Sequence, residues 1–218
     1  MVRLTVRYGR TKEPVREANH CMKNGQEKIN FRINFIQLVK QIILIPVTTR
    51  PGKKEDAEMI ADISRYCFYH TYAPVNTKAN MDKFMQEQFS HEMLEAEVSD
   101  PGNFFLLAYH MDTLAGYAKL LNKSAHAKLG PSKQVEIGRF YVLPAFKGKG
   151  IGTQLMQACI NYAKSEQADF LWLGVWEKNE PAISFYTHLG FEKLGKHNFK
   201  LGDDIQTDWL MFKSLIED

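Results

Sequence analysis

A strand, a glycine-rich turn and a helix follow one another between residues 135 and 167, and this unit constrains the fold most. Apolar residues predict a strand over Val135–Leu143, which Pro144 ends. The turn is Lys147-Gly148-Lys149-Gly150-Ile151-Gly152, and the periodicity predicts a helix over Gly152–Gln167. The first amides of a helix lack partners within the helix, and the helix dipole adds positive charge there. The unit therefore predicts an anion site suited to a pyrophosphate.

Two familiar phosphate motifs do not fit this turn. A Walker A loop needs Ser or Thr after Gly148-Lys149, where Gly150 stands. A dinucleotide fingerprint needs a third glycine three residues after Gly150, where Thr153 stands, and it usually opens a series of parallel strands. Taken by itself, the turn is equally compatible with a helix start that uses glycine only for tight chain reversal.

The rest of the chain predicts an α/β domain with a mixed sheet and helices on both faces. The strand and helix signals alternate irregularly, which excludes a purely parallel fold, and residues 122–133 form a polar loop. The other predicted strands are Ile42–Thr48, Asn103–His110, Leu114–Leu121, Phe170–Trp176, Phe191–His197 and Thr207–Lys213. The other predicted helices are Lys53–Phe68, a second one that Thr77 caps and that carries Met81, Phe84, Met85 and Phe89, and Glu180–Leu189.

Charge divides the chain into a basic extension, 1–42, and an acidic domain, 43–218. The extension holds nine Lys and Arg against three Glu, a net charge of +6, and the domain holds 19 basic and 22 acidic residues, a net charge of −3. Three interpretations of the extension stay open. It is a loosely docked or poorly ordered segment, an upstream stretch outside the natural protein with Met22 or a later codon as the start, or a functional basic arm.

Composition excludes several classes of protein. The longest aliphatic run, Ile42–Ile45, is far shorter than the ~20 residues of a membrane span, and arginines interrupt any secretory leader. Cys21, Cys67 and Cys159 are widely spaced, which favours a reducing cytoplasm over a disulfide scaffold. We expect no metal, because no His, Cys or Asp cluster has ligand spacing, and neither a membrane nor a nucleic-acid partner.

The glycine turn and the segments around it resemble the GCN5-related N-acetyltransferase (GNAT) superfamily. The turn fits the pattern Q/R-x-x-G-x-G/A, with Lys147 in the first place and Gly150 and Gly152 in the glycine places. Phe140–Pro144 is similar to the core strand of that family, and Val175–Tyr186 to the second half of its acetyl-CoA site. The resemblance covers about residues 43–213. It implies a GNAT fold, whose central sheet is mixed, mostly antiparallel, and splayed between its central strands.

The same resemblance implies acetyl-CoA as the co-substrate. Its pyrophosphate would lie on the turn, and its pantetheine arm would add like a strand between 135–143 and 170–176, where Gly174 permits close approach. The implied coenzyme-binding residues are Tyr141, Val142, Lys147, Gly148, Lys149, Gly150, Ile151, Gly152, Asn179 and Tyr186. Asn179 also has the position of an N-cap for the helix that follows.

Acetyl transfer requires a neutral amine, a stabilised oxyanion and a protonated leaving thiolate. Only about 0.1% of an alkyl ammonium is neutral near pH 7.4, so a base helps. By analogy with the histone-acetylating branch, Glu136 is the candidate base, and strand alternation places it on one face with Gly138, Phe140 and Val142. The analogy gives the Val142 amide to the oxyanion and the Tyr186 phenol to the thiolate. The alternatives are a solvated surface Glu136 and a core Tyr186.

The identity of the acceptor is indicated by a narrower resemblance. Tyr69–Pro74 and the stretch from Gly190 to Asp208 are similar to the PaiA-like branch, which implies a polyamine such as spermidine or spermine. Tyr69 and Tyr72 are the candidate substrate-binding residues, and Asp203, Asp204 and Asp208 could attract a cation, unless they belong to an ordinary surface loop. His70 and His197 carry no assigned role. Acceptors of protein origin, a non-catalytic acyl-CoA-binding domain and a DNA-tethered protein are the alternatives, and a homodimer is expected.

Overall fold

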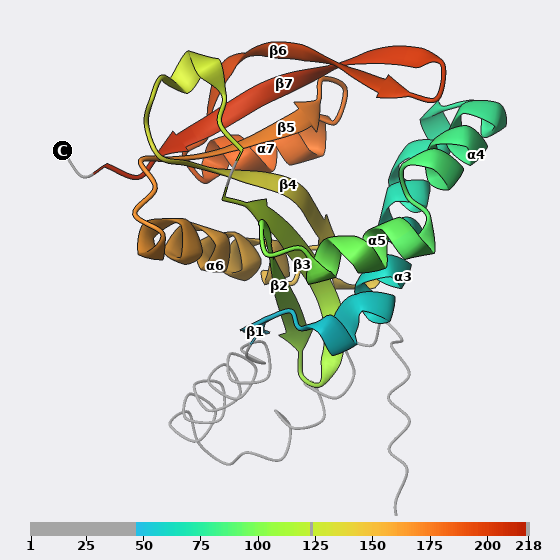
Figure 1. Cartoon of the computed structure of the whole chain (residues 1–218), viewed down its shortest axis with the longest axis horizontal. Coiled ribbons are helices and arrows are strands. Elements are labelled where there is room, and N and C mark those ends of the chain that lie inside the picture. The colour runs from blue at the N-terminus through green and yellow to red at the C-terminus, as the bar shows by residue number, and fades with distance from the viewer. Residues whose placement is uncertain (1–46, 123, 217–218) are drawn as a thin grey trace, which may run out of the picture. The chain divides into compact units, whose positions relative to one another are not determined.

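The computed structural model describes residues 47–122 and 124–216, in which seven strands form one sheet (Figure 1). Its spatial order is β1-β2-β3-β4-β5-β7-β6, and of the six neighbouring pairs only β4–β5 is parallel. The strands are β1 Val47–Pro51, β2 Asn103–His110, β3 Thr113–Leu121, β4 Gln134–Val142, β5 Phe170–Trp176, β6 Glu192–Leu201 and β7 Asp204–Ser214. The predicted mixed, mostly antiparallel sheet is confirmed.

Helices cover both faces of this sheet, as predicted. One face packs against α3 Ala57–Tyr72, α4 Lys78–Glu87 and α5 His91–Ser99, which lie at the right of the sheet in Figure 1. The opposite face packs against α6 Ile151–Ser165 and α7 Glu180–His188. None of the helices described combines the length and the apolar composition that a membrane span requires.

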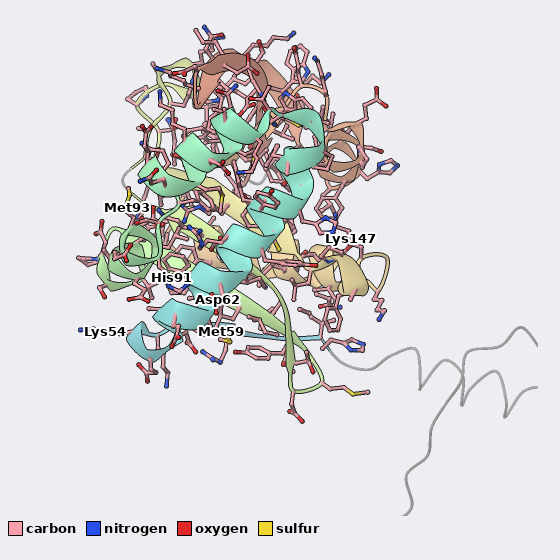
Figure 2. The ribbon with its side chains drawn as sticks, turned by 90° about the vertical axis from the view of Figure 1, so that its right-hand side faces the viewer. Lys54, Met59, Asp62, His91, Met93 and Lys147 are labelled. Carbon is pink, nitrogen blue, oxygen red and sulfur yellow. The ribbon has the colours of Figure 1, made fainter. Side chains whose placement is uncertain are left out.

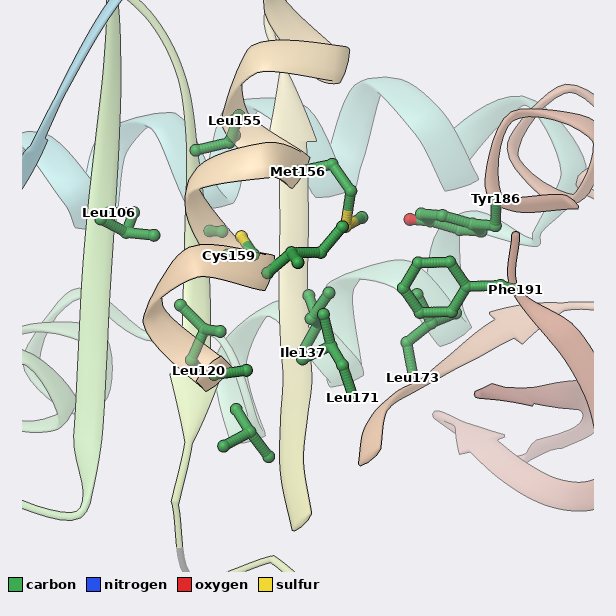
Figure 3. Packing of buried hydrophobic residues seen from close by; sticks show 14 of the residues in the cluster. Leu106, Leu120, Ile137, Leu155, Met156, Cys159, Leu171, Leu173, Tyr186 and Phe191 are labelled. Atoms are coloured by element: carbon green, nitrogen blue, oxygen red, sulfur yellow. The ribbon is translucent and has the colours of Figure 1, made fainter. Parts of the chain in front are cut away.

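The largest core lies between α6 and the sheet, and Figure 3 shows it from close by. Leu155, Met156 and Cys159 of α6 are fully buried against β-strand residues such as Leu120 and Leu171. These α6 residues share one helical face, because they are spaced at one, three and four positions. The predicted buried face of this helix is confirmed.

The opposite core lies under α3. Its Ile60, Ile63, Cys67 and Phe68 are buried as the helical periodicity predicts. The buried hydroxyl of Ser64 lies 2.6 Å from that of Tyr117 on β3, which satisfies both polar groups inside this core.

The helix α5 is tied to α3 at the surface. The two helices meet where His91 Nε2 lies 2.9 Å from Asp62 Oδ1 (Figure 2). The pair is largely exposed, so it contributes little to the free energy of unfolding and serves mainly to fix how the two helices meet.

Several element boundaries differ from the sequence prediction: α3 begins at Ala57, and β6 and β7 extend toward each other to Leu201 and Asp204. The helix α3 runs on to Tyr72, because no breaker precedes Pro74. The second helix is two helices: Thr77 caps α4 as predicted, and Ser90 caps α5 by accepting a hydrogen bond from the Met93 amide at 3.2 Å. The first strand occupies 47–51 where the structure describes it. The extension 1–42, with Cys21, and the beginning of that predicted strand lie outside the described residues.

A charged cluster lies under α5. Arg139 of β4 donates two hydrogen bonds to the Glu97 carboxylate, one of them at 3.1 Å, and Lys119 of β3 lies 3.1 Å from the same carboxylate. The side chains of Lys119, Arg139 and Glu97 are 10%, 12% and 26% exposed. Burial raises the pKa of Glu97, but the two cations outweigh it and hold that pKa below its ordinary value. Two buried cations therefore depend on one carboxylate.

Glu97→Gln is expected to lower the free energy of unfolding by about 3 kcal/mol, because it leaves two buried cations without their counter-ion. Since the folded pKa lies below the unfolded value of about 4.3, the stabilisation is complete above about pH 5 and is lost as the pH falls through the folded pKa. Urea unfolding between pH 3 and pH 8 measures both effects. The exposed Glu95→Gln on the same helix is the control, and an equal loss there would contradict the argument.

Candidate active site

The two central strands, β4 and β5, separate partway along their length. Their parallel pairing runs only from Gln134 opposite Phe170 to Ile137 opposite Leu173. Beyond that point β4 remains paired with β3, and β5 remains paired with β7 as far as Trp176. The facing edges of the two strands are therefore free of each other, and the predicted splay is confirmed.

A β-bulge at Gly138 lies where this gap begins. Leu120 of β3 is opposite Ile137 and the next residue, Lys119, is opposite Arg139, so Gly138 is the extra residue. A Cβ built at Gly138 would lie 2.5 Å from Leu121 Cδ1, so a side chain would force a shift there.

The bulge reverses the alternation of β4. Ile137 before it and Phe140 after it both pack in the α6 core, whereas Tyr141 packs under α3. Glu136 is adjacent to Ile137 and so points to the α3 side, opposite to Phe140 and Val142. The prediction that Glu136 shares a face with those two residues is wrong, because it assumed an unbroken strand.

A cavity of about 500 Å³ occupies the gap. Its wall comes from the end of α3, the free halves of β4 and β5, the turn before α6 and the start of α7. These segments come from three separate stretches of the sequence, within 67–72, 137–153 and 173–186. The cavity therefore joins the two stretches that were predicted to bind a ligand.

The glycine turn presents bare backbone to this cavity. Gly148 and Gly150 have φ values of +74° and +78°, and a Cβ built on either would meet nothing within 4 Å. The helix α6 begins at Ile151, and Gln154 is the first residue whose amide has an acceptor in the helix, the Gly150 carbonyl at 3.1 Å. The preceding amides have no acceptor in the helix, which suits an anion. Lys147 lines the cavity and adds a positive charge.

Gly152 has a packing role. A Cβ there would lie 3.3 Å from the Phe185 ring of α7, so this glycine lets α6 and α7 approach closely.

The free edge of β4 also supplies amides. The Leu143 amide donates to Ala115 of β3 at 2.8 Å. Because successive amides of a strand point to opposite edges, the Val142 amide points away from β3 and into the gap. Tyr141 also lines the cavity, and its partly buried ring packs against the core under α3.

The helix α7 holds the candidate acid. Asn179 caps this helix by accepting a hydrogen bond from the Ala182 amide at 3.3 Å, and it also lines the cavity. Two turns later Tyr186 is 8% exposed, and Figure 3 shows its ring reaching from α7 toward the side of α6. Its hydroxyl has no hydrogen-bond partner among the described residues. Burial raises the pKa of Tyr186, so the phenol stays protonated.

The candidate base Glu136 lies apart from these groups. Its carboxylate accepts a hydrogen bond from the hydroxyl of Ser124 in the loop after β3, and it is not part of the cavity wall. The sequence placed it correctly in the strand. The sequence prediction did not include the bulge at Gly138, which places the side chains of Glu136 and Phe140 on opposite faces of the sheet.

The predicted acceptor residues divide into two groups. Tyr72 lines the cavity and packs edge-on against Trp176, with 6.2 Å between ring centroids, whereas Tyr69 is 48% exposed and lies outside the wall. Asp203 is exposed and paired with Lys83, but Asp208 is partly buried beside His197.

Sequence reasoning missed Cys67 and Arg139 as cavity residues. The glycine inside the predicted strand was the available sign that β4 is irregular. The described residues contain no group of three or more His, Cys, Asp and Glu side chains that could hold a metal ion.

Comparisons with known proteins find relatives of this chain. The model of the Acetyltransferase (GNAT) family matches residues 65–191. An uncharacterised N-acetyltransferase of the pepI 3′ region in Lactobacillus delbrueckii subsp. lactis is 36% identical over 165 residues, which are 76% of this chain and 95% of that protein.

Two solved structures with bound coenzymes have a similar fold. The PaiA N-acetyltransferase of Thermoplasma acidophilum in complex with coenzyme A has a TM-score of 0.61 at 24% identity, over 78% of this chain and 99% of that one. The yncA protein of Salmonella typhimurium with acetyl-CoA has a TM-score of 0.60 at 22% identity, over 79% and 96%.

Gly150→Ala is expected to raise the dissociation constant for coenzyme A at least tenfold, because its Cβ enters the space above the turn and because φ +78° strains any other residue. Isothermal titration calorimetry measures this. Gly130→Ala is the control, since Gly130 also has a positive φ, +71°, open surroundings and a place outside the cavity wall. Equal weakening in both variants would mean that backbone strain, and not the ligand site, is responsible.

Proposed function

This chain belongs to the acetyltransferase (GNAT) family, and from that premise we propose that it acetylates a primary alkyl amine by direct attack on acetyl-CoA, with a polyamine as the acceptor. The observation that carries the proposal is the gap between β4 and β5. It joins a backbone anion site to a protonated tyrosine in one cavity.

The residues of the cavity fit the coenzyme. Amides at Gly148–Gly152, together with Lys147 and Lys149, would hold the pyrophosphate. The free edges of β4 and β5 would pair with the pantetheine arm in the manner of an added strand, with Tyr141 and Val142 contributing backbone groups. Asn179 uses its side-chain oxygen for the cap, so its amide nitrogen is available to the coenzyme.

Two groups would assist the chemistry. The Val142 amide points into the gap and would donate to the developing oxyanion. Tyr186 would give its proton to the leaving sulfur. Burial raises the pKa of Tyr186 above that of an ordinary phenol, and the leaving thiol has a lower pKa than any phenol. A proton transfer to the free thiolate would therefore be uphill, so proton transfer and cleavage of the carbon–sulfur bond must be concerted.

The candidate base Glu136 lies outside the cavity wall. Glu136 could serve only by releasing Ser124 and reaching the cavity, since its carboxylate does not line it. Glu136→Gln therefore separates a base from a structural carboxylate. A base role predicts at least a tenfold loss of kcat, and a structural role predicts little change.

The chemistry of the acceptor side favours a cation. Tyr72 and Trp176 offer aromatic surfaces beside Asp208, and aromatic faces with a carboxylate suit a slender alkyl ammonium. We expect saturable thiol release from acetyl-CoA with spermidine or spermine. Turnover with lysine peptides or N-terminal peptides instead would replace the polyamine by a protein amine. Coenzyme binding without turnover on any amine would contradict the acetylation of an amine altogether.

Tyr186→Phe is expected to lower kcat at least tenfold with the accepted amine, since it removes the proton donor while keeping the ring in the core. The dissociation constant for coenzyme A should change less than threefold. Tyr162→Phe is the control, because that hydroxyl accepts a hydrogen bond from Asn122, which follows β3, and lies outside the cavity wall. Full kcat in Tyr186→Phe would exclude the acid role.

Two further expectations belong to this proposal. Cys67 and Cys159 are free buried thiols, which fits action in a reducing compartment such as the cytoplasm. Homodimerisation is the expected oligomeric state, and analytical ultracentrifugation of the full chain measures it.

A further inference from the structure

A histidine–aspartate pair lies beside the gap, on the face of the sheet that packs against α3 and α4. His197 of β6 and Asp208 of β7 are opposite each other, and Nε2 lies 3.6 Å from Oδ2. Asp208 is in turn opposite Trp176 at the free end of β5. Asp208 is thus one strand and His197 two strands away from β5, and neither residue belongs to the cavity wall, which adjoins the pair at Gly174.

Gly174 opens the cavity toward this pair. It lies in β5 and lines the cavity. The position that a Cβ would take at Gly174 is 3.4 Å from His197 Nε2 and 3.5 Å from Asp208 Oδ2. Because Gly174 has no side chain, only its Cα separates the cavity from the imidazole nitrogen and the carboxylate oxygen. A Cβ at this position would be in ordinary contact with both atoms and would stand between them and the cavity.

The carboxylate of Asp208 has unused hydrogen-bonding capacity. Its Oδ1 is buried and has no hydrogen-bond partner among the described residues, and the side chain is 14% exposed. A buried carboxylate oxygen without a partner is costly, and an ammonium group brings three donors and the opposite charge. Burial raises the pKa of Asp208 against the opposing effect of His197, as expected for a carboxylate that lacks a close cation.

The surroundings of the pair select a cation over an anion. The charged and titratable groups that face it are the Tyr72 phenol of α3 and Glu177, which follows β5. Lys196 is held by Glu177 at 2.8 Å and lies over the Trp209 ring, so it is directed away from the pair. Lys178 lies over the Trp176 ring, with Nζ 5.9 Å from its centroid. At the pair itself, the charge that an incoming ligand would meet is the Asp208 carboxylate.

We propose that the His197–Asp208 pair receives the acceptor ammonium, with Asp208 binding it and His197 taking its proton. This inference rests on the proposed acetyl transfer and deepens it by assigning the base. One N–H bond of the ammonium breaks and its proton goes to His197 Nε2, where Asp208 Oδ2 stabilises the imidazolium. The neutral nitrogen forms its bond to the acetyl carbon, the carbon–sulfur bond breaks, and the sulfur takes the Tyr186 proton. The attacking nitrogen loses its second proton as the amide forms, and that proton restores the Tyr186 phenol, so the imidazolium holds the one proton that the reaction releases. The substrate class is a slender primary alkyl ammonium that enters from the α3 and α4 side.

The pair is tested with Asp208→Asn and His197→Gln in the full chain, by thiol release with the amine that the wild type accepts. Asp208→Asn should raise KM for the amine at least tenfold. His197→Gln should lower kcat at least tenfold at neutral pH and recover part of it at high pH, where the free amine is already neutral. The dissociation constant for coenzyme A and the melting temperature should stay close to the wild-type values. Asp82→Asn, an exposed aspartate of α4, controls for the change in net charge.

Gly174→Ala is the second variant. It should not disturb folding, because the atoms nearest to the added Cβ lie at ordinary van der Waals distances from it. It should raise KM for the amine while leaving coenzyme A binding unchanged. Equal weakening of coenzyme A binding would assign the space to the coenzyme and overturn the proposal.

Other outcomes separate this proposal from the proposed function. If the wild type turns over an amine while Asp208→Asn and His197→Gln keep its acceptor kinetics within twofold, the pair has no such role. If the kinetic loss and its recovery at high pH appear in Glu136→Gln instead, Glu136 is the base. Turnover of no amine at all by the wild type would refute the proposed function, and this inference with it.

Discussion

The end of the β4–β5 pairing at Ile137 and Leu173 is the constraint on which the rest of the site depends. A parallel pair normally satisfies its edge amides and carbonyls by continuing. Here each strand continues with its other neighbour only, β4 with β3 and β5 with β7, so two edges stay available to a ligand without loss of the sheet. The opening is therefore fixed by the pairing of four strands and does not require a mobile loop.

The two faces of the sheet contribute different groups of residues to this opening. The α6 and α7 side brings the glycine turn, Asn179 and Tyr186 to the cavity, and its core is continuous beneath them. The α3 side brings Tyr72 and the buried cluster of Arg139 with Glu97, which fixes β4 just after its bulge. Coenzyme groups and acceptor groups would thus approach the gap from opposite sides, as direct attack requires.

The sequence predicted the parts of the site that local backbone chemistry dictates. The glycine turn and the cap at Asn179 follow from residue types at fixed spacing, whereas Tyr186 follows from the resemblance to the family. The structure brings all three into one cavity. The face of Glu136 was predicted wrongly because one extra residue, Gly138, reverses the alternation, and a bulge depends on the partner strand. The division of the second helix at Ser90 was missed because the apolar pattern continues through Phe89.

The acceptor side depends even more on pairing between distant strands. His197 and Asp208 are eleven positions apart and become neighbours only through the β6–β7 register, which a bulge between Lys193 and Gly195 shifts by one residue. A slip of one position would turn either side chain to the opposite face. The surroundings of Gly174 depend on the register in the same way, because only the pairing of β5, β7 and β6 brings two polar atoms next to the position of its Cβ. The proposed anion site can thus be predicted from consecutive residues, whereas the proposed acceptor site is formed only by the pairing of distant strands.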